Sequence, residues 1–403
     1  MQTVEAKFQN HTGFVLYDPL QKKTLYDYKG SHYFTPGSNT KIFTFFASLK
    51  LLGDSVPGIR YATSGDSLIF WGTGDPSLLY TKTHTNNKVM DFLGKEASTY
   101  RLFYSPANFN TEYFGRGWAW DDYNDYYSTE RSSLPLYGNI VTVSNGSKRL
   151  NIDPPFLRKS VFMGEKRAKP EVRREEGSNL ITYHPGNYTT KKVFEIPVKV
   201  TPELTRDLLA DTLKQNVQLV NIPVRKDTRY VNSIPTDSLY KVMMKESDNF
   251  VAEQLLLLCS NAVSDTLDPD IAIKYVTKEF LTGLTDKPIW IDGSGLSRYN
   301  LFTPRTIAQL WEKIYSEVPR ERLFSLLATG GTVGTLKNYF KSEQPYVFGK
   351  TGTLSNNHCL SGFLVTKHGR ILIFSFMNSN FVRPVSEIRI EMEHILKDFY
   401  EKL

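Results

Sequence analysis

The amino-acid sequence predicts a mixed α/β (α+β) protein in which one core of strands and helices is interrupted by a β-rich insertion. The chain begins with a hairpin pattern and an apolar helix, and it ends with two strand patterns and a helix. Between these ends, short strand-like runs alternate with Gly, Pro, Asn and Asp turns. We therefore expect residues 1–60 and 235–403 to share one domain with a central antiparallel sheet. Residues 61–234 are expected to be inserted into it as one or two subdomains.

The first elements place a serine at the start of a helix. Residues 12–17 and 24–28 are predicted strands that flank a turn. Pro36 and Gly37 then interrupt the pattern, and residues 41–52 are apolar and helical up to a glycine. Ser38 is therefore expected at the N-terminus of a buried helix.

Helices return after the insertion, which itself contains one predicted helix at residues 201–214. Asp268 is placed to cap an amphipathic helix that starts at Pro269. Two strands joined by a tight turn and a last amphipathic helix end the chain. The predicted elements of this half are helices at 250–259, 269–281, 306–318, 321–328 and 385–403 and strands at 360–366 and 370–377.

Composition excludes several classes of protein. The 403 residues are 40% hydrophobic and 23% charged, as in ordinary globular proteins, and no apolar run is long enough for a membrane span. The net charge of +7 comes from dispersed residues, so we expect no nucleic-acid partner. Cys259 and Cys359 are too few for a disulfide framework, and their role stays open. The first residues lack the features of a signal peptide, so an exported form is expected to have lost its leader.

Three short motifs occur in order along the chain. They are Ser38-Asn39-Thr40-Lys41 (SxxK), Ser247-Asp248-Asn249 (SxN) and Lys350-Thr351-Gly352 (KTG). Each is weak alone, and a second SxxK (238–241) and a second SxN (355–357) are present. Ser38, however, opens a buried helix, and KTG occurs once, directly before the predicted strand pair. The ordered set is typical of penicillin-binding proteins and class A β-lactamases.

The residue types of the first motif fit nucleophilic catalysis. A serine hydroxyl needs a base to take its proton, and Lys41 lies one helical turn from Ser38 on the same face. Lysine serves as a base when burial and a nearby cation, here Lys350, lower its pKa. Backbone N–H groups of Ser38 and Thr353 are expected to form an oxyanion hole.

The other motifs are expected to hold the substrate and the leaving group. Ser247 is expected to relay a proton to the leaving amine, and Asn249 to bind the substrate amide. Lys350, Thr351 and Thr353, with Gly352 between them, are expected to bind the substrate's terminal carboxylate.

Further segments resemble those of the DacB-type D-alanyl-D-alanine carboxypeptidase/endopeptidase family, peptidase family S13, the class C low-molecular-mass penicillin-binding proteins. The long separation of Ser38 from Ser247 is similar to the family's, which carries insertions there. The segments that match are 72–77 (GTGDPS), 117–122 (GWAWDD), 292–298 (DGSGLSR) and 334–336 (GTL). Leu354 stands where some relatives have Met, so the detail of the side-chain pocket is open.

The resemblance implies a penicillin-recognition (serine β-lactamase-like) domain and a serine DD-peptidase that uses neither cofactor nor metal. It implies peptidoglycan stem peptides as substrates, β-lactams as covalent inhibitors, and a periplasmic or cell-wall location. It also implies that Trp118, Asp121 and Arg298 recognise the diaminopimelate-like side chain of the stem. Carboxypeptidase and endopeptidase activities, the stem diamino acid and the oligomeric state stay open.

Three alternatives remain at this point. A serine β-lactamase shares the three motifs, although the insertion and the GWAWDD segment favour a peptidase. A non-catalytic wall-binding or penicillin-sensing module can use the same fold. A GDSL-type esterase is suggested by residues 65–68, but no histidine follows an Asp at the DxxH spacing that such enzymes need.

Overall fold

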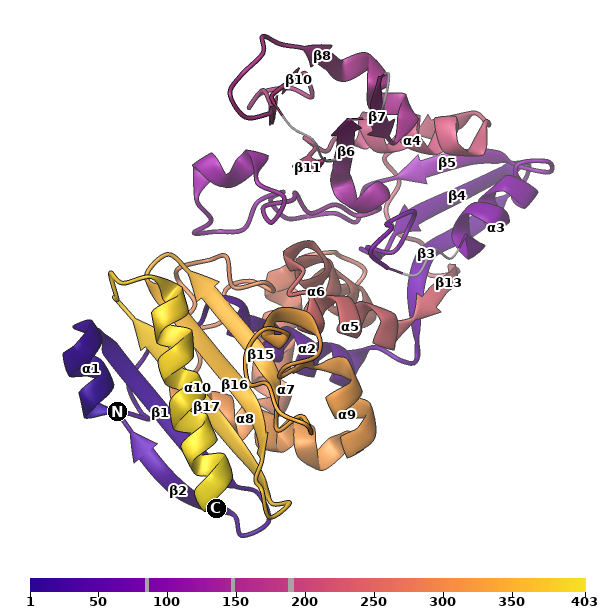
Figure 1. Ribbon diagram of the computed structural model, residues 1–403. Coiled ribbons are helices and arrows are strands. Elements are labelled where there is room, and N and C mark those ends of the chain that lie inside the picture. The colour runs from indigo at the N-terminus through magenta and orange to yellow at the C-terminus, as the bar shows by residue number, and fades with distance from the viewer. Residues whose placement is uncertain (84–86, 146–148, 188–191) are drawn as a thin grey trace.

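The computed structural model describes residues 1–83, 87–145, 149–187 and 192–403. Its core is a six-stranded antiparallel sheet in which the N-terminal hairpin pairs with the last strands of the chain (Figure 1). His11 in the first strand lies opposite Ser379 in the last one. In sheet order the strands are β14 (Ala328–Thr329), β15 (Val347–Leu354), β16 (Asn357–Val365), β17 (Ile371–Ser379), β1 (His11–Asp18) and β2 (Lys23–Tyr28).

Helices cover both faces of this sheet, so its central strands are apolar along most of their length. On one face, Phe374 and Phe376 of β17 pack in a cluster with Leu396 of helix α10 (Val385–Lys402), and α1 (Gln2–Phe8) lies on the same side. On the other face, Ile373 belongs to a larger cluster built by the remaining helices of the core. These helices are α2 (Lys41–Leu51), α5 (Thr236–Lys245), α6 (Asn249–Val263), α7 (Pro269–Phe280), α8 (Pro304–Glu317) and α9 (Arg320–Leu326).

The inserted segment leaves and rejoins the core through two paired strands, β3 (Ser55–Ser64) and β13 (Arg229–Pro235). Both belong to a five-stranded sheet completed by β4 (Ser67–Gly72), β5 (Arg101–Ser105) and β12 (Val217–Leu219), with α3 (Lys88–Glu96) and α4 (Pro202–Leu213) packed on it. Two three-stranded sheets lie beyond it (Figure 1). In sheet order, the first contains β11 (Val193–Pro197), β6 (Ile140–Asn145) and β7 (Leu150–Asp153). The second contains β8 (Val161–Met163), β10 (Ile181–His184) and β9 (Glu171–Arg174).

The expected boundary at residue 60 falls inside β3, and the one at residue 234 falls at the end of β13. Because β3 and β13 pair with each other rather than with the core sheet, we propose to divide the chain at both outer ends of this pair, after residues 54 and 235. Helices α1 and α3 were not expected from the sequence, and no predicted range covers α5. Within the described ranges, no helix combines the length and apolar character that a membrane span requires.

Candidate active site

Ser38 lies in a 3-10 turn (Gly37–Thr40) that leads directly into α2, as predicted. Lys41, the first residue of α2, is fully buried. Its Nζ donates to Ser38 Oγ at 2.9 Å, to Asn249 Oδ1 at 2.6 Å and to the carbonyl oxygen of Ser294 at 2.7 Å. The three hydrogen bonds use all three protons of an ammonium group and fix the amine beside the serine hydroxyl.

Burial lowers the pKa of Lys41 to about 8, because the charged amine loses its hydration. The carboxylates of Asp292, Glu253 and Asp248 act in the opposite direction and keep the pKa from falling further. Lys241 of the second SxxK lies exposed on α5. The first SxxK therefore has a buried lysine beside its serine, whereas the lysine of the second SxxK faces solvent.

Ser247 and Lys350 form a second pair. Lys350 Nζ donates to Ser247 Oγ at 2.7 Å and to the carbonyl of Thr351 at 2.6 Å. Lys350 is fully buried, and this burial, followed by the nearby charge of Lys41, holds the pKa of its amine well below the usual range. Ser247 has a left-handed backbone, with φ of 62°, in the turn between α5 and α6.

The SxN motif owes its geometry to the start of α6. The Asp248 side chain caps this helix by accepting from the N–H of Val251 at 3.0 Å. Asn249 is then the first helical residue, and its side chain links the core to the insertion. Its Oδ1 accepts from Lys41, and its Nδ2 donates to the carbonyl of Tyr127 at 2.9 Å.

The KTG strand packs against the turn that contains Ser38 by backbone contact. A Cβ on Gly352 would overlap the carbonyl oxygen of Pro36 and lie 2.9 Å from the amide nitrogen of Ser38. A Cβ on Gly37, which has φ of +51°, would lie 3.0 Å from the backbone nitrogen of Thr353. The backbone amides of Ser38 and Thr353 therefore belong to two segments in close contact, while the oxyanion hole stays a prediction, and only glycine fits at position 352.

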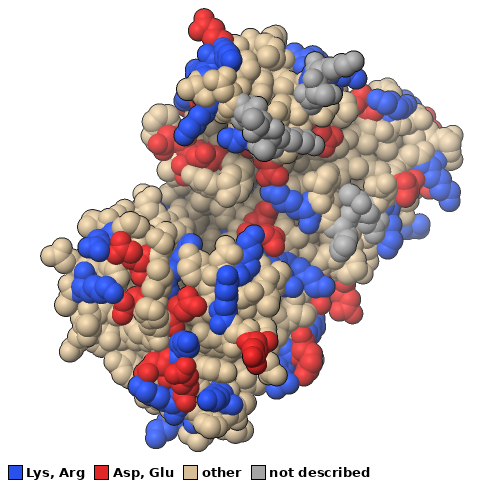
Figure 2. All heavy atoms as spheres, viewed as in Figure 1, with Lys and Arg blue, Asp and Glu red and all other residues tan. Residues whose placement is uncertain are grey.

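A cavity of about 1330 Å³ opens over these residues. Its walls come from the core and from the insertion, and Figure 2 shows the molecule hollowed between these two parts. Asp121 and Arg298, which were predicted to recognise substrate, both line it. The core also contributes Ser38, Ser247, Asn249, Thr335 and Thr353, and the insertion contributes Lys82, Asp122, Tyr126 and Tyr127.

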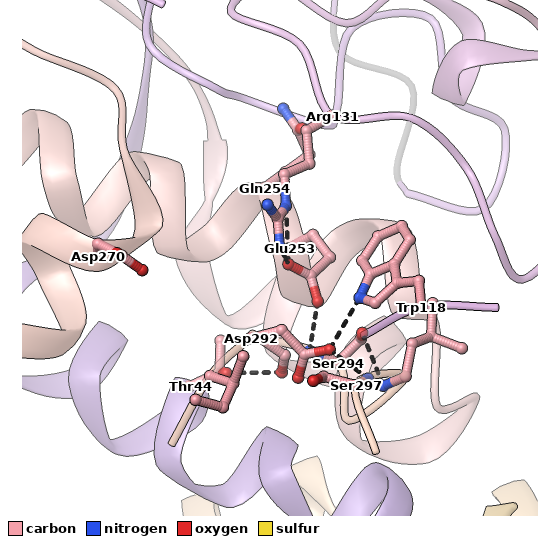
Figure 3. A network of polar contacts seen from close by, with 12 residues as sticks. Thr44, Trp118, Arg131, Glu253, Gln254, Asp270, Asp292, Ser294 and Ser297 are labelled. Atoms are coloured by element: carbon pink, nitrogen blue, oxygen red, sulfur yellow. Dashed lines mark hydrogen bonds and ion pairs between the residues drawn. The ribbon is translucent and has the colours of Figure 1, made fainter. Parts of the chain in front are cut away.

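Trp118 is half-buried and is not among the residues that line this cavity. Its indole N–H donates to Asp292 Oδ2 at 2.9 Å, and the guanidinium of Arg131 lies 5.2 Å from the centre of its ring (Figure 3). The polar edge of the indole is therefore used inside the protein. We propose that Trp118 supports the Asp292 loop, and its contact with the substrate stays a prediction.

Asp292 and Glu253 support the residue that holds Lys41 (Figure 3). Glu253 accepts from the backbone N–H of Ser294 at 2.7 Å and pairs with Arg131 at 2.5 Å, with both side chains buried. Asp292 accepts from the backbone of Ser297 at 2.7 Å, and burial, followed by the charge of Glu253, raises its pKa. Ser294 is thus fixed at its N–H while its carbonyl binds Lys41.

Several residues of the site were not expected from sequence. Asp292 and Ser294 lie in the DGSGLSR segment, but Glu253 and Arg131 belong to no motif and meet only in the folded chain. Thr335 accepts a hydrogen bond from the Thr351 hydroxyl at 2.7 Å. This bond uses the hydroxyl proton of Thr351, a residue that was predicted to bind the substrate carboxylate. Among the described residues, no group of His, Cys, Asp and Glu side chains is arranged to hold a metal ion.

The GDSL segment has a simple structural role. It forms the turn between β3 and β4, where Ser67 Oγ donates to the carboxylate of its neighbour Asp66 at 3.0 Å. The esterase alternative therefore gains no support from the structure.

The family profile of D-Ala-D-Ala carboxypeptidase 3 (S13) matches residues 2–398. The chain is 23% identical to D-alanyl-D-alanine carboxypeptidase DacB of Haemophilus influenzae, over 92% of this chain and 85% of that protein. It is 24% identical to the D-alanyl-D-alanine carboxypeptidase of Actinomadura sp., over 93% and 78%. The crystal structure of penicillin binding protein 4 (dacB) from H. influenzae superposes with a TM-score of 0.81 at 20% identity over 99% of both chains, which confirms the predicted fold class. The chain therefore belongs to the D-Ala-D-Ala carboxypeptidase 3 (S13) family and is a serine DD-peptidase.

Proposed function

We propose that the protein cleaves peptidoglycan stem peptides that end in D-Ala-D-Ala, through an acyl-enzyme on Ser38. The observation that carries this proposal is the 2.9 Å hydrogen bond between Ser38 Oγ and Lys41, a buried amine whose pKa is about 8. Ser38 lines one cavity with Thr353 of the KTG strand and with Ser247, whose hydroxyl accepts from Lys350. The named activities of the relatives support the same choice of substrate.

In the proposed acylation, Ser38 Oγ attacks the carbonyl carbon of the penultimate D-Ala and its proton passes to neutral Lys41. The oxygen that becomes negative lies between the N–H groups of Ser38 and Thr353. Ser247, whose hydroxyl is held by Lys350, then relays the proton that Lys41 accepted to the leaving amine as the C–N bond breaks, so that Lys41 is neutral and Ser247 is a hydroxyl again. The released product is D-Ala, and water later hydrolyses the ester on Ser38.

The terminal carboxylate of the substrate is proposed to bind at Lys350 and Thr353. Thr353 lines the cavity, whereas the Thr351 hydroxyl already donates to Thr335. Thr351 is therefore assigned to orienting Thr335. Asp121 and Arg298 lie on the cavity wall and present a carboxylate and a guanidinium, which suit the amino and carboxylate groups of a stem diamino acid.

The size of the cavity supports action on more than a terminal D-Ala. About 1330 Å³ exceeds the roughly 300–1,000 Å³ of ordinary small-molecule sites. We therefore propose that cross-linked stem peptides are cleaved as well, by the same acyl-enzyme. Because its proposed substrate is the cell wall, we place the protein outside the cytoplasm.

The test compares the wild type with Ser38→Ala on two purified substrates, a pentapeptide muropeptide and a cross-linked dimer, with the products separated by chromatography and weighed. Release of D-Ala by the wild type alone supports the carboxypeptidase activity, and monomers from the dimer support the endopeptidase activity. Fast, repeated hydrolysis of penicillin without either product would instead indicate a β-lactamase. Acylation by penicillin without any hydrolysis would indicate a sensing module.

A further inference from the structure

The hydroxyl of Thr353 lies between two side chains that the proposed reaction does not use. His358 is directly opposite Thr353 in the β15–β16 pairing, and its Nδ1 lies 2.8 Å from Thr353 Oγ1. Arg389, on α10, approaches the same oxygen with Nη2 at 3.5 Å. Thr353 itself lines the cavity that holds Ser38. The hydroxyl therefore links the cavity to a polar pair behind the KTG strand.

The two partners differ in what they can do with a hydroxyl. A guanidinium has donors only, so toward Arg389 the oxygen of Thr353 must accept. Arg389 also stacks on Tyr339 at 5.5 Å and, among the described residues, has no ion pair with a carboxylate. It is thus held as a cation aimed at the strand.

His358 is neutral at ordinary pH. It is buried, and this burial, together with the charges of Arg389 and Lys350, lowers the pKa of its imidazole to about 3. A neutral imidazole carries a single ring proton, on Nδ1 or on Nε2. Which nitrogen carries it decides whether Thr353 donates to His358 or accepts from it.

We propose that His358, as the Nδ1–H tautomer, and Arg389 both donate to Thr353 Oγ1 and so position its hydroxyl proton toward the cavity, where it binds the substrate's terminal carboxylate. A hydroxyl oxygen has two acceptor sites and one proton, so two donors fill the acceptor sites and leave the proton for the substrate. With the other tautomer, Thr353 would donate its proton to His358. Only oxygen lone pairs would then face the substrate carboxylate, which can accept hydrogen bonds but cannot donate one. The inference rests on the proposed function and names the residues that select a substrate with a free carboxylate.

The test uses one peptide in two forms, with a free terminal carboxylate and with a terminal carboxamide. His358→Leu removes the donor, whereas His358→Asn retains an N–H group at the δ position. We expect His358→Leu to lower kcat/KM about tenfold for the carboxylate peptide, as for loss of one hydrogen bond to a charged group, and about twofold or less for the carboxamide. His358→Asn should recover most of this loss. Arg389→Met should show the same selectivity for the carboxylate form, with a smaller effect because its contact is longer.

Nitrogen-15 NMR of the wild type provides a readout that needs no substitution. We expect the two ring nitrogens of His358 to show a neutral imidazole protonated on Nδ1. A neutral imidazole protonated on Nε2 would overturn the inference, and so would equal losses on both peptides in the variants. If His358→Leu does not fold, the inference is still tested by His358→Asn, by Arg389→Met and by the NMR assignment of the tautomer.

The outcomes separate this inference from the proposed function. If the wild type cleaves neither peptide, the proposed function fails and the inference fails with it. If the wild type cleaves both peptides at equal rates and Ser38→Ala cleaves neither, the reaction stands but carboxylate selection by Thr353 is wrong. If the wild type prefers the carboxylate and the variants lose this preference, both stand.

Discussion

The state of Lys41 predicts how acylation depends on pH. Only the neutral amine can take the proton of Ser38, and the pKa of Lys41 is about 8. The neutral fraction is then about 0.1 at pH 7 and about 0.9 at pH 9. Because the active form is the deprotonated one, the rate must rise with pH, about tenfold between these two values, and level off above pH 9.

The assay is the second-order rate of acylation by a fluorescent penicillin between pH 6 and 10, with Ser38→Ala as the control for non-specific labelling. A substitution adds a directional test. Asp248→Asn keeps a side chain that can cap α6 but removes a carboxylate that raises the pKa of Lys41. Its midpoint should therefore move to lower pH. By contrast, Asp237→Asn on α5, which removes an ion pair with Arg322 of α9, should leave the midpoint unchanged.

Two results would refute this reasoning. A rate that does not change between pH 6 and 10 would mean that no group titrates as the base. A rate that still rises tenfold per pH unit between pH 8 and 9 and does not level off by pH 10, as for a lysine with the usual pKa of about 10.4, would mean that Lys41 is not desolvated as its burial requires.

Three further predictions concern packing and stability. Gly352→Ala should slow penicillin acylation by at least about 100-fold, or about 2.7 kcal/mol of barrier, because the new Cβ overlaps the Pro36 carbonyl. The control Gly94→Ala, where no atom lies nearer than 4.0 Å to a new Cβ, should be acylated at the normal rate. Glu253→Gln should lower the free energy of unfolding in urea by about 3 kcal/mol, because Arg131 is left buried without a charge partner, and Glu387→Gln at an exposed ion pair should cost about 0.5 kcal/mol or less. The pKa of His358 is about 3 in the folded state, below its unfolded value of about 6.5. Its contribution to stability is therefore complete above pH 6.5 and is lost as the pH falls. The free energy of unfolding decreases by up to about 1.4 kcal/mol per pH unit. Urea unfolding at pH 7 and pH 5 should therefore show a smaller difference for His358→Asn than for the wild type, and an unchanged difference would contradict the assignment.

The parts of the fold that could be predicted from sequence have strong local patterns. The apolar stretch after Ser38 became α2, and Asp268 caps α7 through the N–H of Asp270, as predicted. The pairing of the first hairpin with the last strands was expected only as a shared core, since strand order depends on contacts between distant residues. Helix α3 was not predicted because it is short, carries Gly94 in its interior and has no side-chain cap at Asn87.

The candidate site shows the same division. Its motifs were visible because each is local: one helical turn joins Ser38 to Lys41, and a two-residue step joins Ser247 to Asn249. The support of Lys41 was not visible, since Arg131 and Glu253 are 122 positions apart and pair only after folding. The amphipathic indole of Trp118 suits a substrate contact and an internal hydrogen bond equally well, and its bond to Asp292 could not be expected before the position of Asp292 was known.

The central claim is that Ser38 is the nucleophile, and intact-protein mass spectrometry after incubation with penicillin tests it most directly. The wild type should gain the mass of one penicillin, with the adduct mapped to the peptide that contains Ser38, and Ser38→Ala should gain nothing. A wild type that stays unmodified, or an adduct that persists in Ser38→Ala, would contradict the assignment of the nucleophile.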